Sequence, residues 1–324
     1  MTSSLPLRKT WLDALRAMAI IFVVMGHQAQ WWDVFFTFTT PVKIPLFFVI
    51  SGYLFSTKEG KTKAFFINLF QKLVFPYFCL VTIPAICFAI FNGIGVLWKA
   101  WYSMLSGDVY WFMTCIIVAE AIHFFIRKYC SSLWLISVVC LLCATLGLML
   151  SEHGFLNFAR INNALICQVF LLLGFFIRKY EHVLDRVRTP CVILLLLLYF
   201  ALCYSSQLLF SDISFDCHLN KYYSIPYCGM LIIIGCTTCF MLAKRINKFP
   251  QWLIFIGQNT LIIYLWAGYA MLLFVILGKI GVLLPEKSVL FAFVQTVWAC
   301  LVCMGVAWMV NRYMPFIVGK CKRN

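Results

Sequence analysis

The sequence has little charge, and very little of that charge is negative. Its 324 residues include 26 Lys and Arg but only 11 Asp and Glu. A soluble globular protein has about a quarter of its residues charged, whereas 11% are charged here. The composition therefore excludes a soluble globular fold and predicts an integral membrane protein whose surface mostly faces lipid.

The sequence also lacks the short alternating strands typical of a transmembrane barrel. Hydrophobic residues make up 64% of the chain, and its mean hydropathy is +0.94. The apolar stretches run for roughly twenty residues, the length with which a helix crosses about 30 Å of hydrocarbon. The prediction is an all-α polytopic membrane bundle. We expect ten spans, near residues 12–31, 43–57, 73–91, 109–126, 132–150, 162–177, 190–209, 225–243, 253–277 and 288–310.

No long polar segment separates these spans. The longest connections, near 92–108 and 210–224, are too short to bury a core of their own. We therefore expect residues 1–324 to form a single integral-membrane domain, so that any chemistry belongs to the bundle itself.

Basic residues gather on one side of the predicted bundle. An even number of spans places both termini on the same side, and few basic residues then lie on the other: Lys43, Lys99, Arg160, Lys221, Lys279 and Lys287. The positive-inside rule assigns the termini to the cytoplasm. The net charge of +15 is thus read as a topology signal with a contribution from anionic membrane lipid, and nucleic acid is not expected as a partner.

Cysteine is abundant, with 16 residues, but nearly all lie within apolar spans, where a free thiol packs as a small side chain. The pairs with CxxC spacing are mid-helix and have no histidine at a zinc-ligand distance, so no metal site is predicted. Cys217 lies in a predicted outer loop and Cys228 near the following helix, which leaves one disulfide open.

Ionisable residues inside a span are costly and are candidates for function. Arg16 and His27 lie eleven residues apart on the first span, within roughly 20° of one helix face and about 16 Å apart along the axis. Asp13 can pair with Arg16 on the same side. The structural alternatives are an interfacial anchor for Arg16 and a hydrogen-bonded core histidine for His27.

Two further spans carry candidates. Glu120 lies near the middle of its span, with His123 one turn further inward. A buried carboxylate needs a cation or a proton, and a structural ion pair between helices is the alternative to a catalytic role. On the second span, Ser51 and Gly52 permit close approach of a ligand or of another helix.

These residues resemble the amino-terminal half of the membrane acyltransferase-3 family. The resemblance rests on Leu12-Asp13-Ala14-Leu15-Arg16, the Arg16-x10-His27 spacing and Phe47-Phe48-x-x-Ser51-Gly52-Tyr53. Later stretches are similar as well: Lys72-Leu73-Val74-Phe75-Pro76-Tyr77, Trp111-Phe112-Met113, Phe170-Leu171-Leu172-Leu173-Gly174 and Gly257-Gln258-Asn259-Thr260-Leu261-Ile262-Ile263-Tyr264. Many relatives have a histidine two residues after that tyrosine; Trp266 stands there in this chain.

The resemblance implies a ten-helix enzyme that moves an acyl group, usually acetyl, from cytoplasmic acetyl-coenzyme A to a hydroxyl of a lipid-linked or polymeric carbohydrate. The run from Pro41 to Phe48 looks most like fucose 4-O-acetyltransferase-like members. The enzyme would lie in the cell membrane, a bacterial inner or plasma membrane, with no bound cofactor.

The residue types suit this chemistry. A neutral histidine in a low-dielectric groove can act as a base toward the acceptor hydroxyl, which assigns His27 and, with it, Glu120 to catalysis. Inner cations can hold the phosphates of the donor, which assigns Arg16 with Asp13, Ser51 and Lys72, and the Lys58, Lys61 and Lys63 cluster, to the donor. On the outer side the densest polar group is segment 152–163, which assigns Asn157 and Arg160 to the acceptor.

Two other function classes remain open from the sequence. Buried Arg, His and Glu in a ten-helix bundle are also found in proton-coupled transporters and sugar-lipid flippases. The halves 1–160 and 161–324 show no obvious repeat, which is a point against a transporter. A non-catalytic partner in polysaccharide assembly is the third hypothesis.

Overall fold

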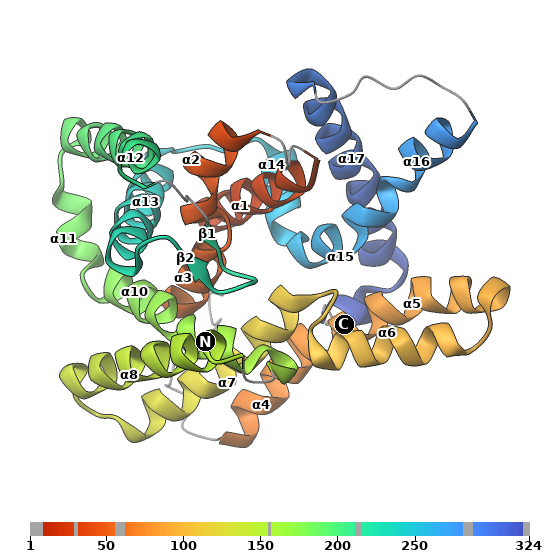
Figure 1. The fold of residues 1–324 in the computed structure, drawn as a ribbon, viewed down its shortest axis with the longest axis horizontal. Helices are drawn as coiled ribbons and strands as arrows, with labels where there is room; N and C mark the ends of the chain where they lie inside the picture. The colour runs from red at the N-terminus through yellow and green to blue at the C-terminus, as the bar shows by residue number, and fades with distance from the viewer. Residues whose placement is uncertain are drawn as a thin grey trace, which may run out of the picture.

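The protein is an all-α bundle in its computed structural model, which describes residues 9–28, 32–55, 62–154, 157–210, 215–280 and 288–319 (Figure 1). Within these ranges the only strands are β1 (Phe215–Asp216) and β2 (Lys221–Tyr222), which form a two-residue antiparallel hairpin. The predicted fold class is confirmed.

The amino-terminal half consists of helices that run in both directions through the bundle. They are α1 (Thr10–Gln28), α2 (Asp33–Lys43), α3 (Pro45–Leu54), α4 (Thr62–Leu69), the π-helical turn η1 (Phe70–Val74), α5 (Phe75–Asn92), α6 (Gly95–Ser106), α7 (Trp111–Tyr129) and α8 (Leu133–Glu152).

The carboxyl-terminal half continues the same architecture. Its elements are η2 (Phe158–Arg160), α9 (Ile161–Ile166), α10 (Gln168–Lys179), α11 (Glu181–Arg186), α12 (Thr189–Leu209), α13 (Ile225–Arg245), α14 (Gln251–Gln258), α15 (Thr260–Ala270), α16 (Leu272–Lys279), α17 (Val289–Tyr313) and η3 (Pro315–Val318).

The described helices are long and apolar enough for multiple membrane crossings. Eight helical segments satisfy length and hydropathy, and the number reaches ten if each of two bent pairs counts as one span. The two pairs are α6 with α7 and the η2–α9 segment with α10, each bent by 45°. The described helices therefore form a polytopic membrane bundle with eight to ten candidate spans, consistent with the predicted fold class.

The second span begins ten residues earlier than predicted. Asp33–Leu54 passes as one span made of α2 and α3, whereas the sequence predicted 43–57. Thr37 and Thr39 donate their hydroxyls to the carbonyl oxygens of Asp33 and Phe35, so these polar side chains are satisfied within the helix. As a result Lys43, predicted at the outer start of this span, lies instead at the end of α2, ten residues into the helical segment Asp33–Leu54.

Helix α1 is the centre of the bundle. It packs against α2, α3, α13, α14, α15 and α17, and Figure 1 shows it between α12–α13 on one side and α15–α17 on the other. Small and apolar side chains on its buried faces, among them Ala17, Ala19 and Ile20, allow the neighbouring helices to pack closely around α1. A residue on α1 can therefore contact several helices at once.

Two helix pairs meet at glycines with their backbones in contact. A Cβ added to Gly52 on α3 would lie 2.0 Å from the carbonyl oxygen of Leu171 on α10, and one added to Gly174 would lie 2.0 Å from that of Val49. A Cβ on Gly257 of α14 would lie 1.8 Å from the carbonyl oxygen of Asp13 on α1. These crossings fix α3 and α14 against their neighbours, because no larger residue fits.

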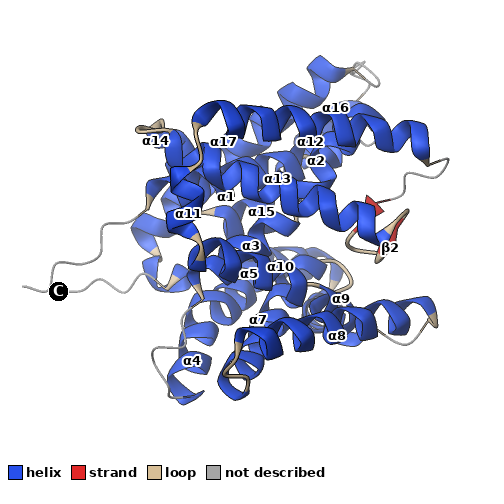
Figure 2. Cartoon of the chain, turned by 90° about the vertical axis from the view of Figure 1, so that its left-hand side faces the viewer, coloured by secondary structure: helices blue, strands red, loops and turns tan. Residues whose placement is uncertain are grey.

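The two ends of the bundle differ in structure. In Figure 2 the hairpin strand β2 lies at one end of the long helices, and α11 and α14 lie toward the other. Cys217, on the hairpin, and Cys228 are both free thiols. The disulfide left open by the sequence is not formed, and both thiols are buried in the packing.

Candidate functional site

A cavity of about 850 Å³ penetrates the bundle between α1, α3, α4, η1, α7, α14 and α15. Four residues predicted from separate parts of the sequence line it together: Arg16, Ser51, Lys72 and Glu120. Leu54 and Phe55, at the end of α3, and Phe65, on α4, also line it. The cavity therefore reaches the end of the bundle at which α3 ends.

Arg16 is held by a chain of polar contacts. Its Nη1 donates to Oδ1 of Asp13 at 3.4 Å, and Nε2 of Gln258 donates to the other carboxylate oxygen of Asp13 at 3.4 Å. The Asp13 side chain is only 2% exposed, whereas that of Arg16 is 29% exposed. Asp13 thus acts from behind the cavity wall to orient a guanidinium that remains accessible to a ligand.

Glu120 borders the cavity deep within α7. Ser51 on α3 donates its hydroxyl to Oε1 of Glu120. The carboxylate also interacts electrostatically with Lys72 and Arg16. It keeps part of its surface accessible because it faces the cavity. Ser51 and Glu120 therefore form one hydrogen-bonded polar pair on the cavity wall, within electrostatic range of both cations.

Lys72 projects from an irregular turn. The π-helical turn η1 interrupts the helix that continues from α4 into α5. Such single turns shift the direction of the side chains that follow and are frequent at functional sites. Lys72 and Asn68, on either side of the start of η1, both line the cavity.

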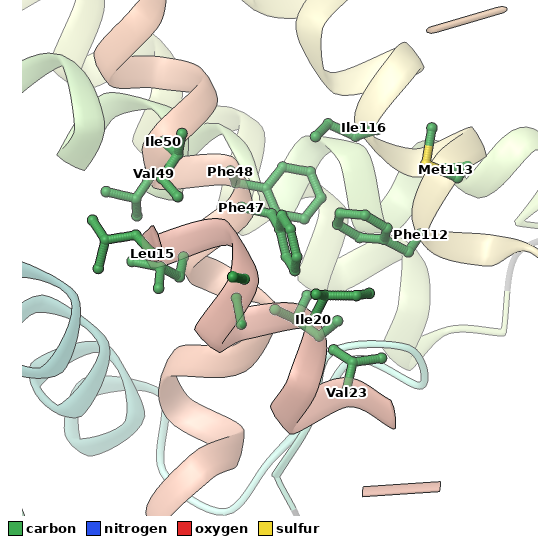
Figure 3. Close-up of a cluster of buried hydrophobic side chains, with 14 of the residues drawn as sticks. Leu15, Ile20, Val23, Phe47, Phe48, Val49, Ile50, Phe112, Met113 and Ile116 are labelled. Carbon is green, nitrogen blue, oxygen red and sulfur yellow. The ribbon is translucent and has the colours of Figure 1, made fainter. Parts of the chain in front are cut away.

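Aromatic side chains line the far end of the cavity. Phe47 on α3 and Phe112 on α7 face each other with ring centroids 5.2 Å apart, above Ile20 and Val23 of α1 (Figure 3). Tyr264 on α15 packs its ring 5.4 Å from that of Phe112 and accepts a hydrogen bond from the Phe112 N–H at 3.4 Å. The cavity thus has a charged inner part and an aromatic end.

His27 lies beyond this aromatic end. It is the penultimate residue of α1, it is exposed, and it does not line the cavity. Seven residues separate it from Ile20, which does line the cavity, so the two lie on one helix face about 10 Å apart along the axis. Lys43 is its charged neighbour. His27 and the cavity-lining residue Ile20 therefore lie on the same face of α1, with His27 nearer the end of the helix.

Asn157 and Arg160 lie in the connection before α9 and are not among the residues that line the cavity. Arg160 has a left-handed backbone (φ 56°), its Nε donates to the carbonyl oxygen of Gly107 at 2.8 Å, and its Nη2 lies 4.0 Å from Oδ1 of Asp108. Nδ2 of Asn157 donates to Oδ1 of Asn163 at 2.5 Å. This segment is an ordered polar surface rather than a loose loop.

Asn163 links that segment to the β1–β2 hairpin. Its Nδ2 donates to the carbonyl oxygens of Cys217 and His218 and to Oδ1 of Asn220, at 2.8 to 3.0 Å. The His218 ring packs 5.2 Å from that of Trp111. Burial, with the positive charge of Arg160, lowers the pKa of His218 below its ordinary value. The hairpin and the 157–163 segment thus form one surface at this end of the bundle.

A second polar network ties the opposite helix ends together. Tyr53 donates its hydroxyl to Oε2 of Glu181 at 2.8 Å and accepts from Nζ of Lys9, while Lys244 donates to Oε1 of Glu181 at 2.7 Å. Burial alone raises the pKa of the Glu181 carboxyl, but the hydrogen bonds from Lys244 and Tyr53 outweigh it and lower the pKa. This network anchors the end of α3 beside the cavity mouth.

Metal ligation has no support within the described ranges. No group of three or more His, Cys, Asp or Glu side chains there could hold a metal ion. Of the predicted lysine cluster, Lys63 is exposed on α4. Lys58 and Lys61 lie outside the described residues.

A family model described as an acyltransferase domain matches residues 9–312. The chain belongs to the acyltransferase-3 family. It is therefore a multi-pass membrane enzyme that transfers acyl groups other than aminoacyl groups. No curated protein and no solved structure matches the chain.

The stretches that resembled the acyltransferase-3 family meet in space. The Phe47–Tyr53 and Phe170–Gly174 stretches pack at the Gly52 and Gly174 crossing. The Gly257–Tyr264 stretch supplies Gln258 to Asp13 and Tyr264 to the aromatic end of the cavity. The sequence placed Gln258, Phe112 and Tyr264 in stretches similar to the family but assigned them no role in a site, and it did not single out Asn68. Amides and aromatic residues at such positions are typical of packing.

Proposed function

We propose that this acyltransferase moves an acetyl group from cytoplasmic acetyl-coenzyme A to a hydroxyl of a lipid-linked or polymeric carbohydrate on the outer side of the cell membrane. The observation that carries the proposal is the cavity itself. It gathers Arg16, Ser51, Lys72 and Glu120 from four separate segments, which a purely structural role for each residue would not require.

The cavity suits the donor. Coenzyme A carries a phosphate and a pyrophosphate, and Arg16 and Lys72 supply cations within one chamber. Asn68 and Gln258 add amide donors and acceptors. Asp13 behaves as a positioning residue, because it contacts Arg16 and lies behind the cavity wall. Ser51 would contact the pantetheine arm of the donor. Glu120, predicted to be catalytic, would act from its place on the cavity wall, where it accepts a hydrogen bond from the Ser51 hydroxyl.

The length of the donor arm suits the distance to His27. Arg16 and His27 are about 16 Å apart along α1, from the helical rise per residue. A fully extended pantetheine arm spans roughly 20 Å, estimated from standard bond lengths of an extended chain. The thioester of a donor anchored at Arg16 would thus reach His27 past the aromatic end of the cavity. The donor would remain cytoplasmic while its acyl group crosses.

The acceptor would approach from the opposite side. His27 is exposed at the end of α1 and, as a neutral imidazole, can take the proton of an attacking hydroxyl. Carbohydrate hydroxyls need paired donors and acceptors, and Asn157 and Arg160 are partly exposed polar side chains held in place by hydrogen bonds at this end of the bundle. We assign Asn157 and Arg160 to acceptor binding.

The reaction would need no bound cofactor and no metal, since a thioester is already activated toward an alcohol. Acetyl is favoured over a charged acyl group such as succinyl. The free carboxylate of a succinyl group would have to pass the aromatic side chains of Phe47, Phe112 and Tyr264. The family membership favours this enzyme over the transporter hypothesis. The fucose 4-O-acetyltransferase-like specificity stays a prediction.

The test uses the purified full chain in phospholipid vesicles with radiolabelled acetyl-coenzyme A and surface glycan extracted from the source cells. We expect free coenzyme A to appear in proportion to label in the glycan, and mass spectrometry to show acetyl esters. Coenzyme A release without label in the glycan would contradict the carbohydrate acceptor. No release with any extract would contradict the donor assignment.

A further inference from the structure

Lys43 brings an ammonium group into the second span beside His27. It is the last residue of α2, next to the break that precedes Pro45, within the span Asp33–Leu54. A Cβ added to Gly26 would lie 3.3 Å from Nζ of Lys43, so the amine reaches α1 one residue before His27. Glycine at position 26 leaves the room that this approach needs.

The ammonium group lies over an aromatic ring, and within the described residues it has no hydrogen-bond acceptor. Among the residues that the structure describes, Lys43 makes no hydrogen bond and no ion pair. Its Nζ lies 4.3 Å from the centroid of the Phe36 ring, over the face that attracts cations. It is half-buried, so its donors remain open to a ligand.

The other ionisable groups around Lys43 do not neutralise it by contact. Asp216 and Cys217 of the hairpin and His27 of α1 interact with it electrostatically. Oδ1 of Asp216 already accepts hydrogen bonds from the N–H groups of His218 and Leu219, at 2.7 and 3.2 Å. An ammonium without a bonded carboxylate inside a span is costly to keep. A role for the ammonium in binding negative charge that develops during the reaction would explain why this cost is tolerated.

We propose that Lys43 stabilises the oxyanion of the tetrahedral intermediate formed next to His27. The inference rests on the proposed function. The imidazole of His27 takes the proton of the acceptor hydroxyl, whose oxygen forms a bond to the thioester carbon while the carbonyl π electrons move to oxygen. That oxyanion accepts hydrogen bonds from the Lys43 ammonium. Collapse restores the carbonyl, breaks the carbon–sulfur bond and returns the proton from His27 to the leaving thiolate.

The location suits this role better than it suits donor binding. Lys43 is not among the residues that line the cavity with Arg16 and Lys72, so it lies apart from the proposed phosphate anchors. It lies beside the group that would perform the proton transfer. A fixed cation at the developing negative charge acts most strongly in a low-dielectric environment.

The experiment compares Lys43→Met with the wild type in vesicles, using radiolabelled acetyl-coenzyme A and the extracted glycan. We expect kcat to fall by about 10²–10³-fold, the usual effect of losing an oxyanion donor. The KM for each substrate and the Kd for acetyl-coenzyme A should stay within about twofold, since neither ground state uses this charge. Lys43→Arg should retain part of the activity. Lys99→Met removes an exposed lysine and should leave kcat unchanged.

A second variant tests the geometry without changing the lysine. Gly26→Ala places a methyl group 3.3 Å from the amine, so kcat should fall while the melting temperature and donor Kd remain close to those of the wild type. An unchanged kcat in Lys43→Met would overturn the inference and leave the proposed function standing. A change confined to the KM of the glycan would overturn it too, and would make Lys43 an acceptor-binding residue. If the wild type itself releases no coenzyme A, the proposed function fails, and the inference fails with it.

Discussion

At the scale of single residues, the arrangement depends on one helix face. Arg16 and His27 were predicted to share a face of the first span, and in the structure Arg16 lines the cavity while His27 lies exposed at the end of α1. A residue that anchors the donor should affect binding, and one that transfers a proton should affect turnover. Their variants therefore separate the two roles.

His27→Ala should reduce acyl transfer by about 10²–10⁴-fold, the usual contribution of a general base. The Kd for acetyl-coenzyme A should be unchanged, because the cavity does not include His27. Steady-state transfer rates and donor binding on the same preparation measure both. His182→Ala is the control, since that histidine is also exposed, on α11 and outside both proposed binding sites. Activity above about a tenth of the wild-type value would exclude the base role.

Arg16→Lys keeps the charge and loses the planar fork that pairs with phosphate and with Asp13. We expect the Kd for acetyl-coenzyme A to rise roughly tenfold, or about 1.4 kcal/mol, which is in the range of one charge-assisted hydrogen bond. Equilibrium binding of radiolabelled donor measures it. Arg188→Lys, at an exposed site, serves as the control. A weaker affinity for the glycan with donor affinity unchanged would contradict the assignment.

At the scale of elements, the cavity depends on glycine crossings between helices. Gly52→Ala would place a methyl group 2.0 Å from the Leu171 carbonyl oxygen, so α3 must move away from α10 and carry Ser51 with it. We expect destabilisation of about 1–3 kcal/mol, as for other overpacked sites, with loss of activity. Thermal unfolding in detergent measures it.

Gly305 on α17 provides the matched control for that substitution. No atom lies within 4 Å of a Cβ added there, and alanine is the better helix former. Gly305→Ala should therefore keep or raise the melting temperature. Equal effects of the two substitutions would mean that the α3–α10 contact does not hold the site.

The elements also show how far the sequence alone could lead. Span lengths and hydropathy gave the helical class, because a lipid environment allows few alternatives. The second span was predicted to start near residue 43, ten residues too late, since Asp33 and Thr37 lower the hydropathy before that point. In the structure the hydroxyls of Thr37 and Thr39 bond within the helix, and the Lys43 side chain packs beside Gly26. Local sequence does not reveal these contacts.

The site was predictable in part for a similar reason. Arg16, Ser51, Lys72 and Glu120 stood out because a charged or polar residue among apolar ones is costly, and the structure gathers them in one cavity. Gln258 was not singled out, because an uncharged amide near a helix end is common. Its contact with Asp13 depends on the approach of α14 to α1, which local sequence does not encode.

At the scale of the whole molecule, the two ends of the bundle differ in a way that sets the direction of transfer. The end of α3 carries the network of Lys9, Tyr53, Glu181 and Lys244 and the mouth of the cavity. The opposite end carries His27, the hairpin and the 157–163 segment. The positive-inside rule predicts that the first end faces the cytoplasm, so a donor and an acceptor on opposite sides of the membrane should both be required.

Sealed membrane vesicles of the two orientations test this directly. In inverted vesicles the cytoplasmic face is outside, so added radiolabelled acetyl-coenzyme A should label glycan in the lumen, where a glycan-degrading enzyme added outside cannot release it. In right-side-out vesicles the same donor should give no label until detergent opens the membrane, because a molecule with several phosphate charges does not cross the hydrocarbon. Vesicles carrying the His27→Ala variant control for other acetyltransferases. Labelling in sealed right-side-out vesicles and none in inverted ones would mean that donor and acceptor share the outer compartment, and the cavity would then have to be entered from the side of His27.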